Sequence, residues 1–184
     1  MNLTLSWDLF IIVFFALVVT YTFIIGKKES VKVIVATYIS IVTVQGMGNL
    51  LQRVTAEAGF SLEGLFGFTA GIPLIAIFKL VAFIIIMVLI TIRAGLSVTY
   101  TKETLLLNIA FTLLCGLATA GLLLSTLLTY VSNLPILDLS MPTLSSLSPI
   151  IQQSPLMQFM ILNQDLWFAF PAAVLIGAGL ASNR

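Results

Sequence analysis

The sequence lacks histidine, has a single cysteine and carries few charges: Asp, Glu, Lys and Arg together make up 8% of its 184 residues. Without histidine there can be neither a Ser–His nucleophile pair nor a Cys/His zinc site. A lone cysteine, Cys115, excludes an intramolecular disulfide, and its position inside an apolar run is typical of a buried small side chain. We therefore expect no cofactor and no bound metal.

Basic and acidic clusters are equally scarce. The net charge is +1, and the longest basic run is Lys27-Lys28. Nucleic acid is thus not an expected partner. Paired carboxylates act as catalysts only where a pocket desolvates one of them. The acidic residues outside the apolar runs stand among turn residues, so we expect no catalysis from Glu57, Glu63, Asp138 or Asp165.

Long apolar runs are what the sequence does have. Hydrophobic residues make up 60% of the chain, and no charge interrupts the longest run, from Thr104 to Leu137. About 20 apolar residues cross a bilayer as a helix, and a backbone in hydrocarbon must satisfy its own hydrogen bonds. These runs predict an all-α fold, a polytopic transmembrane helical bundle in the lipid bilayer, with residues 1–184 forming one domain.

Five spans are predicted, at residues 9–26, 33–51, 74–96, 104–130 and 166–182. They leave two longer connections, 52–71 and 131–164. Within these connections and beside them, 64–78 and 145–162 are each open to an interfacial, re-entrant or spanning interpretation. For the second, an interfacial helix from about Ser154 to Leu162 competes with a loop packed on the bundle. The last run contains Pro171, so whether it crosses fully also stays open.

The distribution of Lys and Arg predicts the orientation, because cytoplasmic loops retain these residues. Arg53 is the one basic residue in the connections on one side of the predicted bundle. The opposite side holds the six basic residues Lys27, Lys28, Lys32, Arg93, Lys102 and Arg184. We therefore place the N-terminus outside and the C-terminus in the cytoplasm, with segments 52–71 and 131–164 outside.

Several landmarks between about Trp7 and Tyr130 resemble the CvpA family, the colicin V production proteins of bacterial inner membranes. They are an Asp before the first span, a Gly with basic residues and a Glu at its inner end, and small residues in the fourth span: Asp8, Gly26, Lys27, Lys28, Glu29, Gly116, Ala120 and Gly121. This resemblance implies a multi-pass inner-membrane protein with a role in bacteriocin production or envelope maintenance, and no established chemistry.

Small residues recur at helical spacing in the fourth span. Thr112, Gly116 and Ala120 share one face, and Gly121 with Ser125 forms a neighbouring stripe. Small side chains let helices in lipid approach closely. Two interpretations are open: packing within the chain, or a face for a homo-oligomer or another membrane protein.

Lys79 is the one charge inside an apolar region, which makes it a candidate for a functional site. It lies 14 residues, or about 21 Å of helix, before Arg93. Two long side chains reaching in opposite directions can place both charges at the edges of a hydrocarbon core of about 30 Å. We therefore favour snorkelling over an ion-path role for Lys79.

Three function classes follow. A structural or interaction protein of CvpA type is preferred. A substrate-binding membrane subunit of a vitamin transporter would need a sixth span and a polar cavity near Asn163, Gln164 and Trp167. A channel or ion-driven stator subunit would rest on Lys79 and on a polar stripe that could line a conduit: Ser40, Thr43, Gln45, Asn49 and Asn108.

The orientation can be tested by labelling single cysteines with a membrane-impermeant maleimide, in a chain whose Cys115 is replaced. In intact cells we expect Glu57→Cys and Ser146→Cys to react, and Lys28→Cys and Thr99→Cys to stay unlabelled, because of the partition of basic residues. Labelling at position 28 in intact cells would reverse the orientation.

Overall fold

The computed structural model describes residues 7–58, 74–93, 105–132, 151 and 154–182. Over these residues the chain is all-α. Its helices are α1 (Trp7–Ala58), α3 (Leu74–Arg93), α4 (Leu105–Val131), α6 (Pro155–Leu162) and α7 (Gln164–Ser182). The predicted all-α helical bundle is confirmed.

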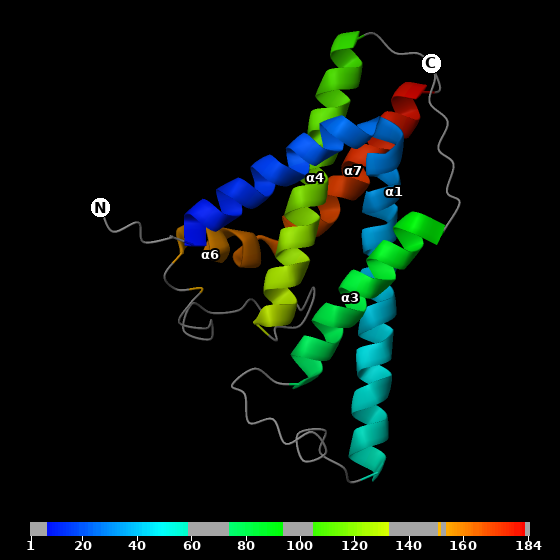
Figure 1. Ribbon diagram of the computed structural model, residues 1–184, viewed down its shortest axis with the longest axis vertical. Helices are drawn as coiled ribbons and strands as arrows, with labels where there is room; N and C mark the ends of the chain where they lie inside the picture. Colours follow the sequence, from blue (N-terminus) through cyan, green and yellow to red (C-terminus); the bar gives the residue numbers. More distant parts are fainter. Residues whose placement is uncertain (1–6, 59–73, 94–104, 133–150, 152–153, 183–184) are drawn as a thin grey trace.

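Gly26 divides α1 into a first arm, residues 7–25, and a second arm, residues 27–58. Its backbone has φ 79° and ψ 171°, a conformation that essentially only glycine adopts without strain. Figure 1 shows the two arms diverging from this point. The arms correspond to the first two predicted spans. The second arm continues to Ala58, so residues 52–58, predicted as part of an outer segment, are helical.

Three helical segments in the described residues are long and apolar enough to cross a membrane: Trp7–Leu51, Ile75–Arg93 and Asn108–Val131. A fourth crossing is added if α6 and α7, which meet at an angle of 66°, form one bent span. The first segment counts once although Gly26 breaks it. These helices mark the chain as a membrane protein, while five crossings stay a prediction.

The structure describes part of the two segments, 64–78 and 145–162, whose interpretation the sequence left open. Residues 74–78 belong to α3, and the helix expected near 154–162 is α6, which begins after the N-cap Ser154. With eight residues α6 is about 12 Å long, too short to cross a bilayer by itself. Residues 64–73 and 145–150 lie outside the described residues.

α4 is the central helix of the bundle. Of its most apolar membrane-length window 67% is buried inside the structure, against 11% for the corresponding windows of α1 and α3. Figure 1 shows α4 between the first arm of α1 and α7. α1 and α3 therefore present most of their apolar side chains outward, toward lipid or other proteins.

Two glycines let the neighbouring helices approach α4 closely. A Cβ added at Gly116 would lie 3.2 Å from the backbone Cα of Val19 in the first arm of α1. At Gly121, a Cβ would lie 2.0 Å from a ring carbon of Trp167 in α7. The indole of Trp167 thus occupies the space that any side chain at position 121 would need.

Pro171 lies inside α7 without ending it, and a side chain from α1 binds the helix backbone nearby. Proline supplies no N–H to the helical hydrogen bonds. The Tyr38 hydroxyl donates a hydrogen bond to the Phe168 carbonyl. This contact joins the second arm of α1 to α7.

The Gly26 turn and the C-terminal end of α7 lie on the same side of the molecule. In Figure 1 the first arm rises from α6 to the Gly26 turn, the second arm descends, and α7 ends on the same side of the molecule as the turn. The N-terminal end of α1 lies beside α6 on the opposite side.

We predict that Gly121→Ala destabilises the protein by about 1 to 3 kcal/mol, since overpacking a tight contact costs that much. The matched control is Gly46→Ala. Gly46 is also inside a helix, but nothing lies within 4 Å of its added Cβ, so this change should be neutral or slightly stabilising. Thermal unfolding in detergent compares the two variants. Equal stability would contradict tight packing of Trp167 against Gly121.

Candidate functional site

A cavity of about 310 Å³ opens beneath the Gly26 turn, between both arms of α1, the C-terminal half of α3, and α4. The side chains that line it are mostly hydrocarbon: Val18, Tyr21, Thr22, Ile25, Ser30, Val33, Met87, Val88, Thr91, Ile92, Thr119 and Leu123. An apolar cavity of about 150 Å³ already takes a molecule of benzene. This space therefore has room for a larger apolar group.

The Ser and Thr hydroxyls around the cavity are engaged with their own helices. Thr22 donates to Val18, Ser30 to Gly26, Thr91 to Met87 and Thr119 to Cys115, each over 2.7–2.9 Å to the carbonyl four residues earlier. Such bonds are the usual way for a hydroxyl to be satisfied inside an apolar helix. These four residues hence offer no free hydroxyl proton to an occupant.

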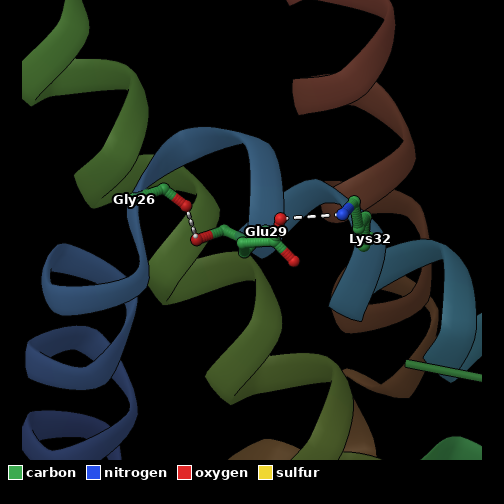
Figure 2. Close-up of polar contacts among 4 residues, drawn as sticks. Gly26, Glu29 and Lys32 are labelled. Carbon is green, nitrogen blue, oxygen red and sulfur yellow. Dashed lines mark hydrogen bonds and ion pairs between the residues drawn. The ribbon is translucent and has the colours of Figure 1, made fainter. Parts of the chain in front are cut away.

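The turn above the cavity is held by short-range polar contacts (Figure 2). The Ser30 hydroxyl that donates to Gly26 closes the first turn of the second arm. The Lys32 ammonium pairs with Glu29 at 2.7 Å, three residues earlier. Lys27 lies over the ring of Phe111 in α4, with Nζ 4.5 Å from the centroid, a cation–π contact. The turn is thereby fixed to the first turns of α4.

This end of the bundle is basic. Lys28 in the turn is exposed, and so is Arg93, the last residue of α3. Arg93 directly follows Ile92, which lines the cavity, and Lys32 directly precedes Val33, which also lines it. Glu29 is the one acidic residue in the described part of the turn, and Lys32 neutralises it.

A second cavity, of about 300 Å³, lies at the opposite end between the first arm of α1, α6 and the start of α7. Its lining is apolar: Ile11, Ile12, Phe15, Leu156, Phe159, Met160 and Trp167. The two amides that a vitamin-binding cavity would require are engaged elsewhere. Asn163 donates to the Phe159 carbonyl, and Gln164 donates to the Thr129 hydroxyl at 3.1 Å.

Asp8 ties the start of α1 to the start of α6. Its carboxylate accepts a 2.5 Å hydrogen bond from the Ser154 hydroxyl and a 3.2 Å bond from the Leu156 N–H. The same Ser154 hydroxyl accepts from the Met157 N–H, as an N-cap. Sequence reasoning missed this pairing. The signal for the cap was Ser154 directly before Pro155, since proline favours the first position of a helix.

The small residues singled out in α4 are all buried: Thr112, Gly116, Ala120, Gly121 and Ser125. Helices of the same chain cover both glycines, through Val19 and Trp167. Thr112 bonds its own helix, whereas the Ser125 hydroxyl has no hydrogen-bond partner among the described residues. Helices of the same chain therefore already pack against Gly116 and Gly121, so a second copy of the chain cannot pack against these two glycines.

Lys79 lies on α3 with its stem against Gly48 in the second arm of α1. A Cβ added at Gly48 would lie 2.5 Å from the Lys79 Cε, so the glycine makes room for the methylenes. Lys79 is half-buried and sits five residues after the start of α3. Apolar contact along the stem, close to a helix end, is the geometry of a snorkelling lysine.

The residues of the polar stripe that could have lined a conduit do not share one environment. Ser40 is buried and donates to Ala36, while Thr43 is exposed and donates to Ile39. Asn49 and Asn108 are exposed. No group of three His, Cys, Asp or Glu side chains that could hold a metal ion occurs within the described ranges.

No protein-family model, curated protein or solved structure matches this chain.

We predict that Lys79→Arg is tolerated and that Lys79→Gln costs under about 1 kcal/mol of stability. If the Lys79 ammonium lies at the bilayer edge, removing its charge leaves no buried counter-charge unpaired. Arg53→Gln, which removes an exposed charge near the end of α1, serves as the control. Thermal unfolding of the three variants checks this. A loss of about 3 to 5 kcal/mol in Lys79→Gln alone would reveal a buried counter-charge and contradict snorkelling.

Proposed function

We propose that this chain is a multi-pass protein of the bacterial inner membrane that acts through interactions with other membrane components, as the resemblance to CvpA implies, in bacteriocin production or envelope maintenance and without catalysis. The supporting observation is that the helices differ in how much of their apolar surface is buried. α4 is buried among its neighbours, while α3 and the arms of α1 carry large apolar side chains on their outer faces.

The outward face of α3 illustrates this. Ile85 and Leu89, four residues apart on one face, are 53% and 54% exposed, while Phe83 on the opposite face is 1% exposed. In lipid such a face can pack against another helix as well as against acyl chains. Interaction is thus the activity for which these helices offer the most surface.

A vitamin-binding subunit has less support. Polar ligands need polar groups aimed into the cavity. Here Asn163 and Gln164 bind protein groups instead, and the cavity next to Trp167 has an apolar lining. Of the region where a sixth span was sought, 134–162, the described part holds Ile151 and Ser154 to Leu162, and its helix α6 is too short to cross.

A photo-crosslinking experiment in cells tests the proposal. With a benzophenone amino acid replacing Ile85 we expect discrete protein adducts, because this face is open; the same residue replacing Phe83 should give none, because that side chain is buried. Deleting the gene should raise sensitivity to detergent or reduce bacteriocin release. Absence of adducts from position 85, together with an unchanged envelope, would refute an interaction role.

A further inference from the structure

The cavity beneath the Gly26 turn has an apolar interior and basic residues at its end of the bundle. Its four internal hydroxyls, those of Thr22, Ser30, Thr91 and Thr119, are bonded to their own helices. These hydroxyls have no proton left to donate to the oxygen atoms of a polar occupant, and most of the remaining lining is hydrocarbon, where an unpaired polar group is costly. The interior therefore favours a hydrocarbon group.

Basic residues adjoin the residues that line this cavity. Ile25 is followed after Gly26 by Lys27 and Lys28, and Ile92 is followed by Arg93. Lys27 is held over Phe111, whereas Lys28 and Arg93 are both exposed. Cations that stand one to three residues from the lining of an apolar cavity, at a helix turn and at a helix end, match an anionic group at headgroup depth.

An anionic phospholipid combines these two chemistries in one molecule. Its acyl chain is apolar, and its phosphate is negatively charged at the level where helices end. Basic pockets between transmembrane helices are the usual sites for anionic headgroups. The size agrees, since about 310 Å³ is within the range of small-molecule sites, though smaller than a whole lipid.

We propose that this cavity holds part of one acyl chain of an anionic phospholipid, whose phosphate is bound by Lys28 and Arg93. The site is separate from the outward face of α3 at Ile85 and Leu89, and it does not depend on a protein partner. Glu29 does not oppose the phosphate strongly, because Lys32 pairs with it.

Binding can be measured by native mass spectrometry of the full chain, titrated in detergent with phosphatidylglycerol or phosphatidylcholine. We expect the chain to retain phosphatidylglycerol preferentially. The double variant Lys28→Gln/Arg93→Gln should bind it about thirtyfold more weakly, the equivalent of about 2 kcal/mol for two charges. Arg53→Gln, an exposed charge removed from the second arm far from the turn, should leave binding unchanged.

A second pair of variants tests the acyl-chain part without touching a charge. Val88 lines the cavity and is 41% exposed, whereas its neighbour Leu89 is 54% exposed and does not line it. Val88→Trp should fill the space and reduce retention of phosphatidylglycerol, and Leu89→Trp should not. Equal retention of both lipids by the unmodified chain, or equal binding by the two Trp variants, would overturn the proposal.

Discussion

Close approach of backbones along α4 is the constraint on which the rest of the bundle depends. Helices in lipid gain little from hydrophobicity, so contact area and fit must hold them together. Gly116 lets the first arm of α1 approach to backbone contact at Val19, and Gly121 admits the indole of Trp167. Both cavities and the Asp8–Ser154 pairing lie where these helices meet their neighbours α3 and α6.

Polar residues inside the bundle are compatible with this packing because most of them bind their own helix. Thr37, Ser40, Thr126 and Thr129 each donate to the carbonyl four residues earlier. Thr129 also accepts from Gln164, so it links α4 to α7. Most of the buried hydroxyls are thus satisfied within their own helix, and the charged residues stand near the ends of the helices or of the two arms of α1. That distribution suits a protein that works through its outer faces and its headgroup-level ends.

The sequence predicted the helices well, and their contacts poorly. The uncharged apolar run predicted the helix α4, and the helix expected from about Ser154 to Leu162 is α6. The orientation and the number of crossings stay predictions. Asp8 and Ser154 are 146 residues apart, and neither periodicity nor spacing within one helix indicates such a pair. The basic turn was visible as Gly26-Lys27-Lys28, but the cavity beneath it depends on how four helical segments tilt against one another.

The position of α4 between its neighbours can be tested most directly through the native Cys115. It belongs to one buried cluster with Val31 and Ile34 of the second arm and with Ala118. Oxidation with a membrane-permeant catalyst should link Cys115 to a cysteine introduced as Val31→Cys or Ile34→Cys, detected as linked peptides by mass spectrometry. Val42→Cys, on the same arm but 73% exposed, should stay unlinked. Linkage from position 42 and none from positions 31 and 34 would contradict a central α4.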